Sequence, residues 1–218
     1  MAVSHLPTAL LLDLDGTLVD SEPIHRQGFR DWFAHRGWPV DERTLNLFTG
    51  RRADDVFASI EGPWSGEDPA ALFAEVVGFV PTDVRPTPIA GAHDLLDWAA
   101  GSGVPLALVT SADHRWANAA LEALGGIGRF AAVVTRDEVG RGKPDPAGYL
   151  LACRLLGVEA SRAAAFEDSP AGVRAAVRAR VGQVVGVTTT WSAQELQEAG
   201  ATHTAADLAE AIEDLSLV

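Results

Sequence analysis

Two carboxylates spaced by one residue follow an apolar run near the start of the chain. The run begins at Ala9 and continues through three leucines, and Asp13 and Asp15 come directly after it. A continuous apolar run is typical of a strand buried on both faces of a sheet, so we predict a strand over residues 9–14. Because side chains alternate along extended chain, the Asp-x-Asp spacing points both carboxylates to one side. Two acids held together repel one another, so we expect a cation beside them.

The single lysine of the chain is a second candidate for chemistry. The sequence contains 17 lysines and arginines, and Lys143 is the only lysine among them. It stands in a loop rich in glycine and proline, residues 140–146. A planar guanidinium cannot replace a compact ammonium where one point charge must fit a tight site. The use of lysine at position 143, in a chain whose other basic residues of this kind are all arginines, therefore predicts a site that requires an ammonium group.

Other polar side chains stand directly after predicted strands. Thr110 and Ser111 follow one apolar run, and Glu167 and Asp168 follow another. The carboxyl ends of parallel strands meet at one edge of a sheet, so groups that are far apart in the sequence converge there. Taken singly, each pair also fits a solvated turn or a helix cap. Found together with the Asp-x-Asp pair and the lysine loop, in this order, they favour one shared site.

Strands and helices must alternate to bring these groups together. The predicted strands after the first are residues 104–109, 131–134, 163–166 and 184–187, and the predicted helices are residues 89–100, 113–124, 147–156, 171–180 and 205–213. This alternation predicts an α/β fold with a doubly wound parallel sheet covered by helices on both faces.

A helical insertion interrupts this alternation after the first strand. Between residues 20 and 85 the apolar side chains recur at helical spacing, with Gly and Pro as punctuation and no strand pattern. We therefore expect a core domain made of residues 1–19 and 86–218. The second expected domain is all-helical and consists of residues 20–85, called the helical insertion below.

Composition limits the classes of partner. The chain has 218 residues, 47% of them hydrophobic, and a formal net charge of −13. A net charge of this sign disfavours nucleic acids and anionic membranes as partners. The single cysteine, Cys153, excludes an internal disulfide and a cysteine-rich zinc site, and we predict that it is buried. No basic segment leads into a long apolar run near the first residues, so we expect a cytoplasmic protein. The oligomeric state stays open, a monomer included.

The collected groups suit a hard metal ion and a phosphorylated small molecule. Mg²⁺ takes oxygen ligands and prefers one or two carboxylates together with substrate phosphate. Thr110, Ser111 and Ala112 lead into a predicted helix, whose free backbone N–H groups favour a phosphate. We therefore expect Mg²⁺ as the cofactor and a phosphate-bearing metabolite as the substrate.

Four motifs resemble those of the haloacid dehalogenase superfamily, in the subclass with a helical cap inserted after the first strand. They are Asp13-Leu14-Asp15-Gly16-Thr17, Thr110-Ser111, Gly142-Lys143-Pro144-Asp145-Pro146 and Glu167-Asp168-Ser169-Pro170-Ala171-Gly172. The resemblance spans nearly the whole chain and implies a Rossmann-like core of five parallel strands in the order 5-4-1-2-3. In that order strands one and four are neighbours, which brings Glu167 and Asp168 next to the first two acids.

The resemblance implies a role for each charged residue. Asp13 would attack phosphorus as the nucleophile, and Asp15 would protonate the leaving oxygen and then deprotonate the attacking water. Asp13, the backbone carbonyl of Asp15 and Asp168 would hold Mg²⁺, with Glu167 bound directly or through water. Lys143 would offset the negative charge of the phosphate.

The same resemblance implies how the phosphoryl group is held and which reaction is favoured. The hydroxyl of Thr110 and the backbone N–H groups near Ser111 and Ala112 would bind the phosphoryl group. Dehalogenases of this superfamily do not need the acid two residues after the nucleophile. The presence of Asp15 therefore favours phosphoryl transfer.

Three residues of the helical insertion are candidates for substrate contact. His25 lies where members of the sugar-phosphate branch have a histidine, and Gly50-Arg51-Arg52 resembles a loop that reaches the site in that branch. Each has an alternative interpretation, as an exposed helix histidine and as a solvated basic turn. Residues 134–144 are similar to bacterial sugar phosphatases, which favours Mg²⁺-dependent hydrolysis of a sugar or polyol phosphate.

Two other functions stay open at this point. A β-phosphoglucomutase shares the core motifs, but its pattern uses a lysine in the insertion and an arginine three residues after the loop glycine. Here position 53 is Ala53 and the insertion contains no lysine, although Arg51 or Arg52 could substitute. A catalytically inactive binding or regulatory member is the third alternative, although every motif residue is intact.

Overall fold

The core of the molecule is a parallel β-sheet that positions the predicted acids at one edge. The computed structural model describes residues 6–81 and 84–214, and within these ranges the main sheet has six strands in the order β5-β4-β1-β6-β7-β8. The strands are β1 Leu10–Leu12, β4 Leu106–Val109, β5 Ala132–Val134, β6 Ala164–Glu167, β7 Gln183–Val187 and β8 His203–Ala205. All neighbouring pairs are parallel.

The five predicted strands are present in the predicted order, but the predicted strand count was wrong. β8 adds a sixth strand at the edge, where it pairs with β7 through Val185–Val187. The element is only three residues long and begins with the exposed His203, so it carries no apolar run. It forms because β7 offers an open edge and not because of a local pattern.

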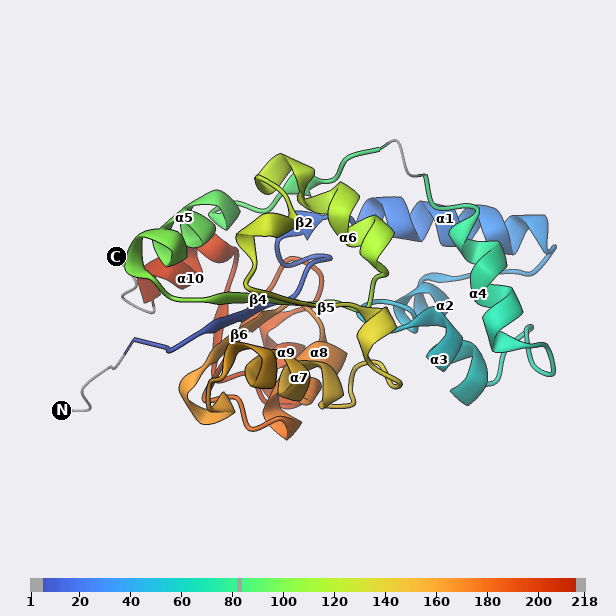
Figure 1. Cartoon of the computed structure of the whole chain (residues 1–218). Coiled ribbons are helices and arrows are strands. Elements are labelled where there is room, and N and C mark those ends of the chain that lie inside the picture. Colours follow the sequence, from blue (N-terminus) through green and yellow to red (C-terminus); the bar gives the residue numbers. More distant parts are fainter. Residues whose placement is uncertain (1–5, 82–83, 215–218) are drawn as a thin grey trace.

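Helices cover both faces of the sheet, as the alternation predicted (Figure 1). One face is covered by α5 Ala92–Ser102, α6 His114–Leu121 and α10 Leu208–Asp214, and the other by α7 Ala147–Leu156, α8 Pro170–Arg178 and α9 Ala193–Ala199. Leu10 and Leu12 pack in one hydrophobic cluster, while Leu11 packs in the other. The strands are apolar throughout because both faces are buried. Short 3₁₀ turns lie at Glu122–Leu124, Ile127–Arg129, Arg136–Glu138 and Ala160–Arg162.

In its described residues, 20–81 and 84–85, the helical insertion contains four helices and its own apolar core. They are α1 Glu22–His35, α2 Glu42–Asn46, α3 Ala53–Ser59 and α4 Pro69–Val77. A short antiparallel pair, β2 Val19–Asp20 and β3 Thr87–Pro88, joins the two ends of this segment to the rest of the chain. Trp32, Phe33 and Trp64 are buried in a cluster that is separate from the two clusters of the sheet. The domain boundaries at residues 20 and 85 stay a prediction.

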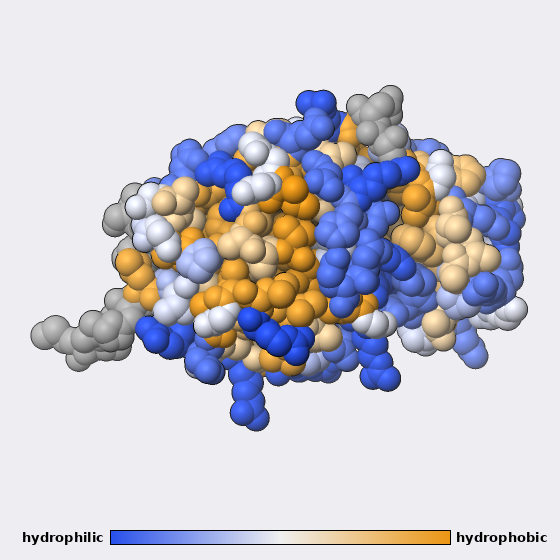
Figure 2. Space-filling view, in the orientation of Figure 1, coloured by the Kyte–Doolittle hydropathy of each residue, from blue (hydrophilic) through white to orange (hydrophobic). Residues whose placement is uncertain are grey.

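Apolar side chains also reach the surface at the β5 edge of the sheet. Figure 2 shows them gathered over the part of this face where β5 and α7 lie. Leu150 and Leu155 of α7 are among the exposed large hydrophobic residues. Along residues 6–81 and 84–214, every helix is too short or too polar to cross a membrane.

Candidate active site

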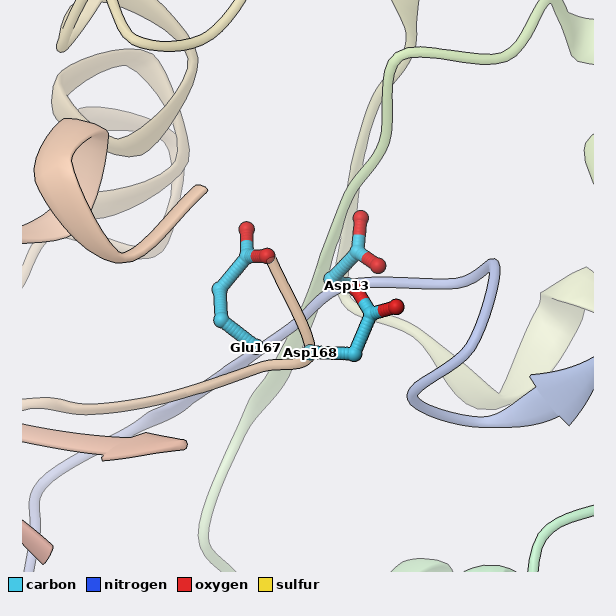
Figure 3. A group of neighbouring side chains, drawn as sticks. All are labelled: Asp13, Glu167 and Asp168. Carbon is cyan, nitrogen blue, oxygen red and sulfur yellow. The ribbon is translucent and has the colours of Figure 1, made fainter. Parts of the chain in front are cut away.

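The register of the sheet brings three buried carboxylates together. Leu12 pairs with Phe166, so Asp13 at the end of β1 lies beside Glu167 and Asp168 at the end of β6. The backbone N–H of Asp13 donates to the carbonyl of Phe166 at 3.1 Å, which fixes this register at the strand end. One oxygen from each carboxylate lies within 4.8 Å of the others. Figure 3 shows the three side chains gathered at these two strand ends.

Lys143 lies between two of these carboxylates. Its Nζ atom lies 2.5 Å from Oδ1 of Asp13 and 2.6 Å from Oε1 of Glu167, and only 7% of its side chain is exposed. Burial alone would lower the pKa of the ammonium, but Asp13 and Glu167 outweigh this effect and raise it. The lysine is therefore held in its charged form, in a space that suits a compact ammonium.

Glu167 is fully committed to groups of the protein. Besides Lys143, it accepts a hydrogen bond from the Tyr149 hydroxyl and a longer one, 3.4 Å, from Ser169. A Cβ atom at Gly172 would lie 1.9 Å from Oε2 of Glu167, so the motif needs glycine there to admit the carboxylate. The sequence analysis missed Tyr149, whose pKa is raised by its burial and by Glu167. Glu167 therefore holds Lys143 in place, and both of its oxygens already contact groups of the protein.

Asp168 is the carboxylate whose surroundings fit a metal ion. Neither of its oxygens has a hydrogen-bond partner of good geometry among the described residues, and the side chain is buried. Burial, together with Asp13 and Glu167, raises its pKa well above the usual value. A Cβ atom at Gly16, whose φ is +79°, would lie 2.1 Å from Oδ2 of Asp168. Unpartnered oxygen donors with excess negative charge are what a hard divalent cation requires.

Asp13 is subject to the same excess of negative charge. Its burial raises its pKa, Lys143 opposes this effect, and Glu167 and Asp15 add to it, giving a value of about 8. Three carboxylates are grouped here, and the ammonium of Lys143 contacts two of them, Asp13 and Glu167. A further cation would favour the ionised form of Asp13, which is the form that a nucleophile needs.

Asp15 is held by three hydrogen-bond donors that all reach the same oxygen. Oδ1 accepts from Oγ of Ser21 at 2.6 Å and from Nε1 of Trp116 at 2.7 Å, and Nε2 of His25 lies 3.2 Å away. Burial alone would raise the pKa of Asp15, but the hydrogen bonds from His25, Ser21 and Trp116 lower it overall. Within the described residues Oδ2 takes no part in a hydrogen bond. The carboxylate is therefore oriented with one oxygen free.

His25 and Trp116 contact the same oxygen of Asp15 but come from different parts of the molecule. His25 belongs to α1 of the helical insertion, whereas Trp116 belongs to α6 of the core, and their ring centroids are 4.7 Å apart. The pKa of His25 would fall through burial, but Asp15 raises it overall. His25 is thus directed to a site residue, and Trp116 is a neighbour that no sequence motif indicated.

The segment after β4 uses its two hydroxyls differently. Oγ1 of Thr110 accepts a hydrogen bond from the backbone N–H of Ala112 at 3.0 Å, so it stabilises the turn. The Ser111 hydroxyl is buried, lines the cavity above Asp13, and has no partner among the described residues. Helix α6 begins only after Asp113, whose side chain caps it. Ser111 therefore has the freer hydroxyl of the predicted pair.

The two arginines of the insertion loop also differ. Nη2 of Arg52 donates to the carbonyl oxygens of Arg136 and Val139 at 2.8 and 2.9 Å. This ties the insertion to the loop that leads to Lys143. Arg51 lines the cavity, and its Nε atom is buried without a hydrogen-bond partner in the described part of the chain. Arg52 also lines the cavity with a buried Nε atom that has no partner there, so the two arginines differ in that Arg52 is in addition held by backbone carbonyls.

A cavity of about 320 Å³ lies between the helical insertion and the core. It reaches Asp13 and Asp15, and His25, Arg51 and Ser111 also line it. If the phosphate group of a substrate were bound at Asp13, the rest of the substrate would lie in this cavity.

Sequence motifs indicated the carboxylates and the lysine of this site, while Tyr149, Trp116 and Ser21 became apparent only from their contacts.

Comparisons with known proteins agree with this arrangement. The family model of haloacid dehalogenase-like hydrolases matches residues 7–180. Validoxylamine A 7'-phosphate phosphatase of Streptomyces hygroscopicus subsp. limoneus is 41% identical over 191 residues, covering 87% of this chain and 89% of that protein. Hexitol phosphatase A of Escherichia coli is 35% identical over 164 residues, covering 75% of each chain.

A solved structure shares the fold over nearly the whole length. CbbY from Rhodobacter sphaeroides, in complex with xylulose-(1,5)bisphosphate, superimposes with a TM-score of 0.80 and 27% identity, covering 94% of this chain and 96% of that one. The match of the family model and the identity to curated relatives extend over most of the chain. This chain therefore belongs to the haloacid dehalogenase-like hydrolases and is a phosphatase of that family.

Proposed function

We propose that this phosphatase hydrolyses a sugar or polyol phosphate with the help of Mg²⁺, through an aspartyl-phosphate on Asp13. The observation that carries the proposal is the buried cluster in which Asp13 contacts Lys143 and faces the unpartnered oxygens of Asp168, at the floor of a cavity. Support for the substrate class comes from relatives named for validoxylamine A 7'-phosphate and hexitol phosphate.

The metal ion would be held by oxygen atoms of three residues. Asp13 and Asp168 would each supply a carboxylate oxygen, and Asp15 would supply its backbone carbonyl. Glu167 would act through Lys143 or a water, because Lys143, Tyr149 and Ser169 already contact its oxygens. A bound Mg²⁺ supplies positive charge that stabilises the phosphoryl oxygens in the transition state.

The chain's own residues can then complete the reaction in two steps. In the first step an oxygen of Asp13 forms a bond to phosphorus while the bond to the leaving oxygen breaks, and Asp15 gives its proton to that oxygen. In the second step Asp15 takes a proton from water as the water oxygen attacks phosphorus. Phosphate leaves and Asp13 is restored as a carboxylate. Lys143 offsets negative charge beside Asp13 throughout.

The surroundings of Asp15 fit both halves of this cycle. The hydrogen bonds to its Oδ1 lower its pKa and favour the base form, which accepts the proton of water. A bound phosphate brings negative charge close to the same carboxyl and raises its pKa, which favours the acid form. The free Oδ2 is the atom through which the proton would move.

A substrate panel with Mg²⁺ and with a chelator tests the proposal. We expect inorganic phosphate to be released from one or more hexose or polyol phosphates in the presence of Mg²⁺, and the release to stop when EDTA is added. Nucleotide monophosphates serve as the comparison class. Absence of phosphate release from every substrate with Mg²⁺ would contradict the proposal and support the inactive binding alternative.

A phosphosugar mutase is the second candidate, favoured by one observation. Arg51 lines the cavity with an unpartnered Nε atom, so a second anionic group of the substrate could bind there. A mutase would convert glucose 1-phosphate into glucose 6-phosphate without net release of phosphate. Product analysis by NMR separates the two functions, because a phosphatase yields glucose and inorganic phosphate instead.

A further inference from the structure

The cavity above Asp13 has two chemically different ends. Asp13, Asp15 and Ser111 lie at the end formed by the sheet. His25 contacts Asp15 from α1, and Phe29 follows one helical turn further along the same face of that helix. Phe29 also lines the cavity and contacts Phe48, with ring centroids 4.4 Å apart. The cavity thus becomes apolar with increasing distance from the carboxylates.

Helix α4 completes this apolar end. Phe73, Val76 and Val77 line the cavity from α4, which lies on the side of the helical insertion away from the sheet (Figure 1). Val80, just after the helix, also lines it. These side chains offer no hydrogen-bond partner to a hydroxyl group. We call Phe29, Phe48, Phe73, Val76, Val77 and Val80 the apolar wall.

The arginines near the apolar wall are already engaged by the protein. Arg26 contacts Glu42 and donates to Asn46 at 3.0 Å. Nη2 of Arg136 lies 2.6 Å from Asp54, and its guanidinium stacks on the ring of Phe73. Arg52 donates to two backbone carbonyls, as described above. These contacts leave fewer donors for a ligand, with Nε of Arg52 still unpartnered among the described residues.

Free polar groups line the cavity outside the apolar wall. Arg51 and Ser111 line the cavity with buried polar atoms that lack partners among the described residues. Glu22, beside His25 at the start of α1, lines it too. These groups can bind hydroxyls next to the phosphate. A ligand with hydroxyls along its whole length would instead leave some of them against the apolar wall, where they lose water without a replacement.

We propose that the substrate is an amphipathic phosphate monoester, with hydroxyls next to the phosphate and an apolar group at the opposite end. This inference rests on the proposed function and specifies its leaving group. A cavity of about 320 Å³ is at the lower end of the range, roughly 300–1,000 Å³, that holds ligands of drug size. A cavity of this size has room for a leaving group that carries an apolar group, and the apolar wall selects that group.

Two sugar phosphates that differ only in an apolar group test this proposal. The measurement is kcat/KM with Mg²⁺ for glucose 6-phosphate and for phenyl β-glucoside 6-phosphate. We expect the phenyl compound to be preferred by about tenfold or more, the lower bound for an added group that fits an apolar pocket. Equal values, or a preference for glucose 6-phosphate, would overturn the inference and leave the phosphatase function intact. Release of phosphate from neither compound, while another phosphate of the panel is hydrolysed, would overturn the inference alone, whereas release from no substrate of the panel would overturn the proposed function.

A variant of the apolar wall assigns the preference to this surface. Val77 is half-buried and is not among the buried members of the insertion's core, so Val77→Thr changes its polarity with little change in shape. We expect the preference for the phenyl compound to fall about tenfold in Val77→Thr. Val77→Ala, which adds no hydroxyl, should reduce it less.

The matched control is an equivalent change outside the cavity. Val84 is 45% exposed, and Val84→Thr should keep the wild-type preference. A preference that stays at the wild-type value in Val77→Thr, or that falls equally in Val84→Thr, would contradict the role of the apolar wall. Because the readout is a ratio of two substrates, a general loss of folded enzyme does not change it.

Discussion

The sheet edge and the helical insertion are both buried, yet they are built from opposite kinds of side chain. At the sheet edge Asp13, Glu167, Asp168 and Lys143 are removed from solvent. In the insertion the buried side chains are mainly aromatic and aliphatic, as in the packing of Phe33 against Trp64. The charged pairs of the insertion lie on its surface instead, for example those that Arg36 forms with Glu67 and Glu75.

This difference separates what the two regions contribute. Burying charged groups costs free energy, and replacing a buried ion pair with apolar groups is often neutral or stabilising. The charged cluster at the sheet edge is therefore not expected to be a main source of the protein's stability. Aromatic pairs contribute roughly 0.5–1.5 kcal/mol each beyond the area that they bury. Changes at the sheet edge should therefore act on the reaction rate, in addition to the loss of stability that follows when a buried charge is left unpaired. Changes in the insertion's core should act first on stability.

Removal of the lysine tests the sheet edge with the largest expected effect. In Lys143→Met the ammonium is lost, and we expect kcat to fall by about 10²–10³, the range for the loss of one charge-stabilising group. The free energy of unfolding in urea should fall by about 3–5 kcal/mol as well, because Asp13 and Glu167 lose their buried partner.

The matched variant Lys143→Arg keeps the charge but changes its shape. We expect kcat of this variant to stay far below that of the wild type, because the bulkier guanidinium does not fit between Asp13 and Glu167. Wild-type kcat in Lys143→Arg would contradict the requirement for an ammonium at this position.

Truncation of an aromatic side chain tests the insertion. Phe33→Ala leaves a cavity beside Trp32 and Trp64, so we expect a loss of about 3–5 kcal/mol in the free energy of unfolding. Phe79, which is half-buried at the rim of the same cluster, is the control, and Phe79→Ala should cost less. Urea titration measures both. A loss of less than 1 kcal/mol in Phe33→Ala would count against an independent core in the insertion.

A smaller effect is expected where the two regions meet at Asp15. Trp116→Phe keeps an aromatic ring but removes the N–H group that donates to Oδ1 of Asp15. We expect kcat to fall about tenfold for an alkyl phosphate, whose leaving oxygen needs a proton, and to change little for p-nitrophenyl phosphate. Trp98→Phe, on a half-buried tryptophan of α5, should affect neither substrate. Equal losses for the two phosphates would refute a positioning role for Trp116.

The smallest expected effect concerns Glu138, a partly exposed carboxylate. Its contribution to the free energy of unfolding should depend on pH with a sign that follows from its pKa. Burial would raise the pKa of Glu138, but hydrogen bonds from Thr135 and His114 lower it below the ordinary 4.5. The folded state then binds its proton at lower pH than the unfolded state. The stabilisation is therefore complete above the unfolded pKa and is lost as the pH falls through the folded pKa.

Urea unfolding from pH 7 to pH 3 measures this dependence. Glu138→Gln should be less stable than the wild type by about 1 kcal/mol or less at pH 7, and the difference should shrink toward pH 3. Glu61 is exposed, and Glu61→Gln should show no such trend. A difference that grows as the pH falls would show that the hydrogen bonds to Glu138 have been misassigned.

The sheet could be predicted from the sequence because its central strands carry long apolar runs. Leu10–Leu12 and the neighbouring strands are buried on both faces, so their pattern is local and strong. β8 depends on pairing with β7, which no local pattern reveals. Helix α9 was also not predicted, although Ser192 and Glu195 form a capping box whose spacing is a signal for a helix start.

The site could be predicted only as far as its residues lie in motifs at strand ends. The approach of Asp13 to Glu167 follows from strand order, and Lys143 was indicated by its being the only lysine. Side-chain contacts are set by tertiary packing, so the sequence did not show that Arg52 binds backbone carbonyls of the core, although Arg51 and Arg52 both line the cavity. The contact of Trp116 with Asp15 spans 101 residues and has no sequence signal.

The measurement that most directly tests the account is the location of the covalent intermediate. During turnover with Mg²⁺ the reaction is quenched with acid, the acyl phosphate is reduced with borohydride, and the modified residue is identified by mass spectrometry of peptides. The account predicts reductive modification of Asp13 in the wild type, and neither modification nor turnover in Asp13→Asn. Modification of another residue, or wild-type turnover in Asp13→Asn, would contradict it.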